Sequence, residues 1–185
     1  MIPSLTPVKS FSTISSLGAV LAVNALKQGF EDVQRHKSDR IMNKRKVEKL
    51  CGREFIGIEW EKLMVGDIIK LKSEEQIPAD CLVLSSSSGE SVCYIETSNL
   101  DGESNHKIRK GLSLTKHLKD VVSLSSWRGV VKSAFPTVPI YEFTGQIGEH
   151  GDFERGYMSF NESNVLLRGS TLTNTDWVYG IVLSL

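Results

Sequence analysis

The 185-residue sequence has few cysteines and no excess of charge of either sign. Its three cysteines, Cys51, Cys81 and Cys93, are an odd number without close paired spacing. That pattern is neither a disulfide framework nor a zinc ribbon, and it is typical of a reducing, cytosolic setting. The four histidines show no metal-ligand spacing with these cysteines. Lys and Arg together number 22, as do Asp and Glu, so the overall charge does not indicate a nucleic-acid partner.

Long hydrophobic runs are also missing. The apolar stretch at 14–26 (ISSLGAVLAVNAL) is too short to cross a bilayer, which takes about 20 residues. It is either a buried core helix or the cytoplasmic half of a spanning helix. From position 31 to 49, seven basic residues and four acidic ones follow it, and basic residues gather on the cytoplasmic side of membrane helices. No secretory leader is expected, because the first dozen residues hold prolines and serines.

The sequence does contain a helical first part and a strand-rich remainder. Residues 14–48 carry few helix breakers and predict one long helix or two in tandem, ended at Cys51 and Gly52. After Gly52, runs of β-branched and aromatic residues recur between turn signals, which favours a sandwich or jelly-roll-like barrel. The expected strands are 55–60, 67–72, 80–84, 91–96, 128–132, 141–147, 165–168 and 177–183.

Three other features complete the predicted fold. Residues 115–124 (TKHLKDVVSL) predict a short helix with Thr115 as a candidate cap. Residues 148–163 are expected to be a polar surface loop, and Asp80 is interpreted as a turn-fixing side chain. A hydrophobic content of 40% is enough for a sizeable core, and the length suits one domain with a short extension.

The candidate chemistry lies in the polar loop that follows the strand at 91–96. Gly102 allows a sharp turn, and Asn99 and Asp101 can hydrogen-bond their own main chain to fix it. Glu103 would then be presented at the tip, where a carboxylate can accept a proton from water. Taken alone, an acidic glycine turn is more often a solvated hairpin tip than a site.

The surrounding motifs resemble the actuator domain of the P-type ATPases, most closely the type-IV branch of phospholipid flippases. They are Pro-Ala-Asp at 78–80, Glu-Thr-Ser-Asn-Leu at 96–100 and Asp-Gly-Glu-Ser-Asn at 101–105. Asp101 points to the flippase branch, because other branches usually have threonine there. Further matching segments are 27–32 with 35–37, Trp60 with 65–68, Tyr-Glu-Phe-Thr-Gly at 141–145, and 164–172 with Asn174 and Trp177.

This resemblance implies a mainly β, distorted jelly-roll or double-stranded β-helix-like actuator domain with an N-terminal helical stalk and one short additional helix. Residues 1–30 would be the end of a membrane helix with a stalk linker. Residues 31–185 would be the actuator domain, with a stalk at 31–50 and a β-rich core at 52–185. The domain would face the cytosol at a membrane, beside the phosphorylation domain and membrane helices of the same polypeptide.

The resemblance also implies a function for the loop. Glu103 would promote hydrolysis of an aspartyl phosphate formed on a separate domain, Gly102 would let the backbone approach it, and Asp101 and Ser104 would hold the loop's shape. The full-length enzyme would use ATP and Mg²⁺ and move a phospholipid, with or without an accessory β-subunit. The chain has no Asp-Lys-Thr-Gly-Thr motif and no phosphate-cradling glycine loop, so it is not expected to hydrolyse ATP alone or to bind a cofactor or metal.

Two other interpretations stay open. The sequence departs from the flippase pattern at Ser104, which keeps the hydroxyl, and at His106 and 132–136. Because of the departures at His106 and 132–136, the chain could be a non-catalytic, flippase-like regulatory module fused to another activity. It could also be a β-sandwich binding domain for a sugar or a protein, because the fold alone does not decide function.

Overall fold

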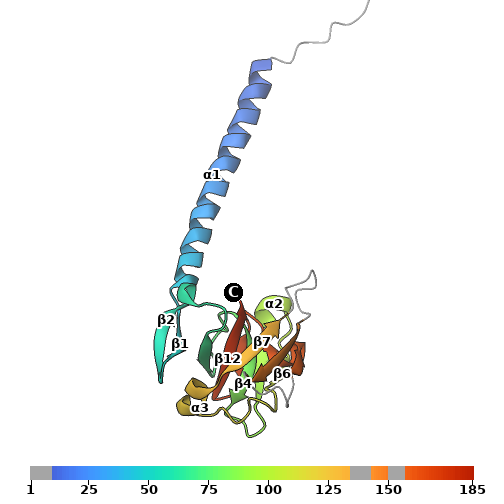
Figure 1. The fold of residues 1–185 in the computed structure, drawn as a ribbon. Coiled ribbons are helices and arrows are strands. Elements are labelled where there is room, and N and C mark those ends of the chain that lie inside the picture. Colours follow the sequence, from blue (N-terminus) through green and yellow to red (C-terminus); the bar gives the residue numbers. More distant parts are fainter. Residues whose placement is uncertain (1–9, 134–142, 150–156) are drawn as a thin grey trace, which may run out of the picture. The chain divides into compact units, whose positions relative to one another are not determined.

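The structure, a computed structural model, describes residues 10–133, 143–149 and 157–185, with side chains from residue 16 onward. The chain divides into two compact units, Met1–Lys44 and Arg45–Leu185. The first contains helix α1, Ser10–Asn43, drawn in blue in Figure 1. No proline interrupts it, and Lys27 and Glu31, one turn apart, form an ion pair at 3.7 Å. Among the described residues, no helix combines the length and the apolar character needed to cross a bilayer.

The prediction that the helix continues to about residue 48 is wrong. Helix α1 ends at Asn43, and Lys46–Cys51 is strand β1. This strand pairs antiparallel with β2, Glu54–Glu59, and it buries Val47, which is 5% exposed. Gly52, with φ at +65°, lies in the turn of this hairpin and does not end a helix. Strand pairing and burial of Val47 therefore outweigh the local helix propensity of a charged segment.

The described residues of the second unit form three antiparallel sheets. The largest has the order β10-β4-β12-β3-β1-β2, and the two smaller ones have the orders β11-β5-β6 and β7-β8-β9. This arrangement confirms the predicted mainly β fold. The remaining strands are β3 Ile68–Lys72, β4 Asp80–Ser86, β5 Val92–Glu96, β6 His106–Lys110, β7 Gly129–Ser133, β8 Thr144–Glu149, β9 Met158–Asn161, β10 Val165–Leu166, β11 Thr171–Thr173 and β12 Trp177–Ser184. The short helices are η1 Trp60–Lys62, α2 Ser98–Asp101, α3 Val121–Ser126 and η2 Glu162–Asn164.

Strand β4 lies between two hydrophobic cores. Successive side chains of a strand point to opposite faces, so Cys81 and Val83 enter one core while Leu82 and Leu84 enter the other. All four side chains are fully buried. The neighbouring strand β12 divides in the same way, with Val178 in the first core. This explains why both segments are continuous apolar runs and do not alternate with polar residues.

Three further details of the sequence-based prediction are corrected. The helix expected at 115–124 is α3 at Val121–Ser126, and its cap is Asp120, which accepts a hydrogen bond from Ser123 N at 2.8 Å. Thr115 instead donates from its buried hydroxyl to Leu84 O at 2.8 Å. Within the expected loop at 148–163, residues 158–161 form strand β9, and 150–156 lie outside the described residues. The expected strand at 141–147 begins at Thr144, and residues 141–142 also lie outside the described part of the chain.

Asp80 fixes the start of β4 to two distant segments. Its Oδ1 accepts a hydrogen bond from Arg168 N and its Oδ2 accepts one from the Ser184 hydroxyl, both at 2.8 Å. These bonds join the Pro-Ala-Asp element to the turn after β10 and to the end of β12. The structural interpretation of Asp80 agrees with these contacts.

Candidate functional site

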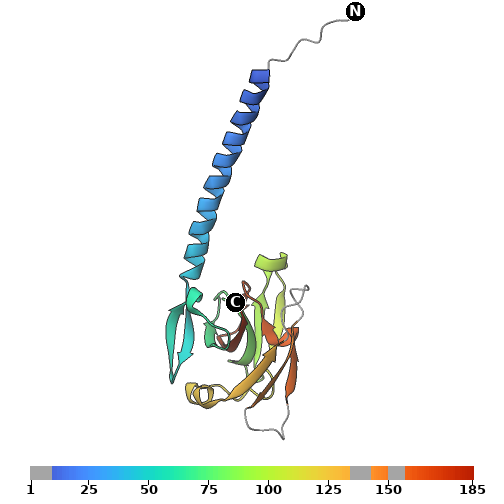
Figure 2. The ribbon, with the colours of Figure 1, turned by 45° about the horizontal axis from the view of Figure 1, so that its top comes forward.

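The candidate loop connects β5 to β6, and helix α2 forms its first turn. In Figures 1 and 2, α2 protrudes from one end of the β-rich unit. Leu100 N donates to Thr97 O at 2.8 Å and Gly102 N donates to Ser98 O at 3.1 Å, which closes the turn. Gly102 ends it in the left-handed region, with φ at 76° and ψ at 2°. The chain then enters β6, which pairs with β5 from Glu96↔His106 to Val92↔Lys110.

The base of this loop is rigid because β5 belongs to the core. Ile95 and Cys93 are fully buried, and Ile95 lies directly opposite Lys107 in the strand register. Strand β11 pairs with the other edge of β5, with Thr171 opposite Glu96. The loop therefore extends from a strand that is paired on both sides.

Asp101 is the centre of the hydrogen bonds that shape the loop. Its carboxylate accepts from the Thr97 hydroxyl, at 3.0 Å to Oδ1 and 2.9 Å to Oδ2, and from Glu103 N at 3.0 Å. Lys107 Nζ lies 2.5 Å from Asp101 Oδ2. The bond from Lys107, followed by the backbone bond from Glu103, lowers the pKa of Asp101 to about 2. Of the two side chains predicted to fix the turn, Asn99 and Asp101, Asp101 makes a bond of that kind.

Glu103 lies at the exposed tip. Its side chain is 60% exposed, and its Oε2 is 3.5 Å from Lys107 Nζ. The carboxylate therefore keeps a contact with its own domain and remains open to a docking partner. Ser104, also exposed, makes no side-chain hydrogen bond within the described part of the chain. The four predicted positions are consecutive, but only Asp101 has side-chain contacts suited to holding the loop.

Sequence reasoning missed Lys107 and the role of Thr97. Lys107 contacts both acidic side chains of the loop, and Thr97 contacts Asp101 through one hydroxyl. The sequence shows the spacing between Glu103 and Lys107. Only the strand at 106–110, however, shows that the Lys107 side chain turns back towards the loop. Two neighbours also have partners: Ser98 Oγ donates to Glu96 Oε1 at 2.7 Å, and His106 Nδ1 lies 3.2 Å from Thr173 Oγ1.

A small hollow of about 220 Å³ lies beside the loop. Burial lowers the pKa of Arg109, and its Nε has no hydrogen-bond partner among the residues that the structure describes. The hollow therefore brings a second cationic side chain near Lys107, which lies on the same face of β6. Its lining residues are Thr97, Leu100, Asp101, Lys107, Arg109, Glu162 and Leu167.

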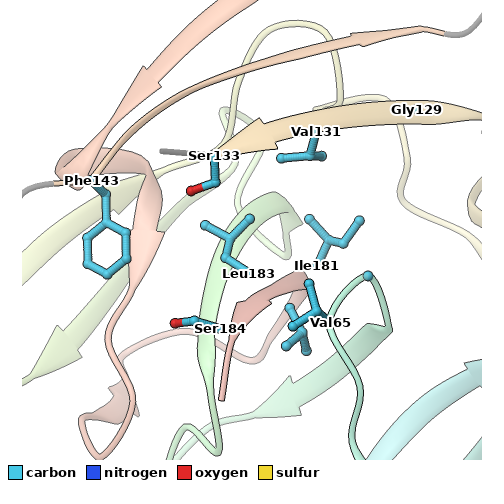
Figure 3. A pocket seen from close by; sticks show the side chains of 10 residues that line it. Val65, Gly129, Val131, Ser133, Phe143, Ile181, Leu183 and Ser184 are labelled. Atoms are coloured by element: carbon cyan, nitrogen blue, oxygen red, sulfur yellow. The ribbon is translucent and has the colours of Figure 1, made fainter. Parts of the chain in front are cut away.

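A larger, apolar cavity of about 450 Å³ has a different character. Figure 3 shows Val131, Phe143, Ile181 and Leu183 around it, with Val65 at its edge. None of its lining residues is titratable, and it shares none with the loop at 97–107. The acidic and basic side chains described above therefore lie around the loop and not around this cavity. Among the residues that the structure describes, no group of three His, Cys, Asp or Glu side chains is placed to hold a metal ion.

The titration of Asp101 is a direct test of the loop geometry. Its pKa is depressed from an ordinary value of 3.8, so its stabilising contribution is present above about pH 4 and is lost as the pH falls through about 2. We expect ¹³C NMR of the Asp101 carboxyl carbon to give a midpoint near 2, and Lys107→Met to raise it. Lys110→Met, on an exposed lysine of the same strand, should leave it unchanged. A midpoint near 3.8 in the unaltered chain would contradict the contacts described above.

Comparison with known proteins identifies the class of this domain. The sequence model of the P-type ATPase actuator domain matches residues 41–178. The chain therefore belongs to the P-type ATPase family and carries its actuator domain, which confirms the resemblance inferred from the motifs.

The curated relatives with high identity to this chain are named phospholipid-transporting ATPases. A phospholipid-transporting ATPase from Schizosaccharomyces pombe is 42% identical over 183 residues, covering 98% of this chain and 14% of that protein. One from Saccharomyces cerevisiae is 38% identical over 184 residues, covering 98% of this chain and 13% of that protein. One from Homo sapiens is 36% identical over 183 residues, covering 99% of this chain and 15% of that protein. The chain thus spans about a seventh of the length of these relatives.

Proposed function

We propose that this chain is the actuator domain of a phospholipid-translocating P-type ATPase and that its Asp101–Ser104 loop promotes dephosphorylation. The names of the relatives support the class of transport, and the exposed carboxylate of Glu103 on a rigid loop supports the reaction. In the full-length protein, ATP with Mg²⁺ would phosphorylate an aspartate on a separate domain. The actuator would then bring this loop onto the acyl phosphate.

The chemistry assigned to the loop is a hydrolysis. A water oxygen forms a bond to phosphorus, the bond from phosphorus to the aspartate oxygen breaks, and Glu103 accepts the proton that water loses. Gly102 carries no side chain, so the backbone can approach the phosphate closely. Asp101 holds the tip through its bonds to Thr97 and to Glu103 N. Ser104 would contribute its hydroxyl on docking, since it makes no side-chain hydrogen bond to the described residues of this domain.

The proposed partners follow from this assignment. They are the phosphorylation domain and membrane helices of the same polypeptide, the transported phospholipid and, where the parent uses one, an accessory β-subunit. The domain would work at the cytosolic face of a membrane, and hydrolysis of the acyl phosphate would be coupled to lipid translocation. On its own, the chain is expected to be inactive as an ATPase.

A non-catalytic regulatory module is the competing function. This alternative is based on the departures from the family pattern at His106 and at 132–136. Of these residues, 134–136 lie outside the part of the chain that the structure describes. His106 has a partner in Thr173 and leaves the Asp101 contacts intact, which favours the catalytic assignment.

Phosphoenzyme formation separates the two functions. We expect the full-length protein to form an acid-stable, hydroxylamine-labile phosphoenzyme from labelled ATP, and removal of Mg²⁺ with EDTA before ATP to prevent it. Vesicles of phosphatidylserine, phosphatidylethanolamine or phosphatidylcholine, tested one at a time, should include one that accelerates phosphoenzyme decay. Absence of any phosphoenzyme in the presence of Mg²⁺ would favour the regulatory module.

A further inference from the structure

The Lys107 side chain contacts both carboxylates of the candidate loop. Its Nζ lies 2.5 Å from Asp101 Oδ2 and 3.5 Å from Glu103 Oε2. The two contacts differ in strength, because 2.5 Å is within hydrogen-bonding distance and 3.5 Å is a looser ion pair. Lys107 is thus held mainly by Asp101, and Glu103 is free to leave it.

The backbone around this lysine is fixed. Lys107 lies opposite the fully buried Ile95 in the β5–β6 pair, and its side chain is 33% exposed. Asp101 is held independently by the Thr97 hydroxyl. The ammonium group therefore occupies a defined position between a core strand and a tied carboxylate, next to the one loop carboxylate that is largely exposed.

We propose that Lys107 is a positioning residue for Glu103: anchored on Asp101, it holds the Glu103 carboxylate in the orientation needed when the loop docks. This inference rests on the function proposed for Glu103. Two negative side chains at positions 101 and 103 repel each other, and the ammonium group, which contacts both, offsets that repulsion. Rotation of Glu103 away from its 3.5 Å contact would then deliver the carboxylate to water without disturbing Asp101.

The role is one of orientation and not of folding. The turn is closed by backbone bonds from Leu100 and Gly102, and Glu103 N bonds to Asp101, none of which involves Lys107. A partly exposed ion pair contributes little to global stability. Loss of Lys107 should therefore leave the domain folded and widen the range of positions that Glu103 samples, which slows a reaction that depends on alignment.

The test uses the full-length protein and follows the decay of labelled phosphoenzyme after a chase. Lys107→Met keeps the length of the side chain and removes its charge. We expect it to slow decay about 10-fold, within the range that misplacement of a catalytic group costs, with phosphoenzyme formation unchanged. Lys107→Arg restores the cation and should bring decay back to within about threefold of the unaltered protein, a remainder that reflects the different shape of guanidinium. Lys110→Met is the matched control, because Lys110 is exposed on the same strand and forms no ion pair with the loop. The phosphoenzyme of this variant should decay at the rate of the unaltered protein.

A double variant tests the anchor on Asp101. Asp101→Asn should slow decay to a similar extent, and Asp101→Asn with Lys107→Met should be no slower than the slower single variant, because residues in one network are not additive. Normal decay in Lys107→Met, no recovery in Lys107→Arg, or full additivity would each overturn the positioning role. Glu103→Gln, measured in parallel, distinguishes failure of the proposed function from failure of the role of Lys107 alone. If it decays normally, the proposed function fails, and if it blocks decay while Lys107→Met does not, only the role of Lys107 fails.

Discussion

In the full-length protein, Glu103→Gln is expected to form phosphoenzyme normally and to lose it about 10² to 10⁴ times more slowly. The amide has the same shape as the carboxylate and keeps the backbone bond from Glu103 N to Asp101, so the loop should still dock. It cannot accept a proton from the attacking water, and a positioned base typically contributes that factor. The corresponding increase in the barrier is about 3 to 5 kcal/mol. The measurement is a pulse with labelled ATP followed by a chase with EDTA.

A carboxylate elsewhere on the same hairpin provides the control. Glu90 is exposed and precedes β5, whereas Glu103 follows it, so Glu90→Gln removes one negative charge from the other end of the strand. Its phosphoenzyme should decay at the rate of the unaltered protein. If Glu103→Gln decays at that rate as well, the carboxylate at 103 is not the base, and the loop must act by contact alone.

The sequence predicts the centre of this fold better than its edges. Strands β4 and β12 are visible as continuous apolar runs because both of their faces are buried, and their predicted ranges overlap the observed ones closely. Strand β1 was assigned to the helix because its charged residues are good helix formers, and only its pairing with β2 and β3 shows otherwise. Strand β9 escapes prediction for a related reason: it is short, and Phe160 is its one buried side chain.

In the candidate loop, too, contacts between residues close in sequence can be predicted, whereas contacts that depend on strand pairing cannot. The turn at Gly102 and the bond from Asp101 to its own backbone are local, and residue type was sufficient to predict them. The contacts of Lys107 depend on the β5–β6 register, which brings a strand residue back onto the loop. His106 illustrates the point as well, since its partner Thr173 is 67 residues away in sequence. The sequence therefore located the loop and the role of Asp101 in it, but not the contacts of Lys107.

Gly102→Ala is expected to be the other variant with a large effect. At φ +76° a side chain is strained even though no atom lies within 4 Å of the added Cβ, so the cost comes from the backbone and not from crowding. An L-residue in this region costs roughly 1–2 kcal/mol, and the turn can relieve that strain only by shifting the tip that carries Glu103. A displacement of that kind costs up to about 100-fold in rate, so we expect phosphoenzyme decay to slow by about 10- to 100-fold.

The cause of that effect can be isolated with two matched variants. Gly57 in β2 also has open space around an added Cβ, but its φ is not in the left-handed region, so Gly57→Ala should leave both decay and the urea unfolding midpoint unchanged or slightly improved. Gly102→Asn places a larger side chain at the same position, yet asparagine tolerates the left-handed region. Decay in Gly102→Asn should therefore be faster than in Gly102→Ala. If the larger side chain were the slower of the two, steric contact with the docking partner, and not the backbone conformation, would be the reason that glycine is needed there.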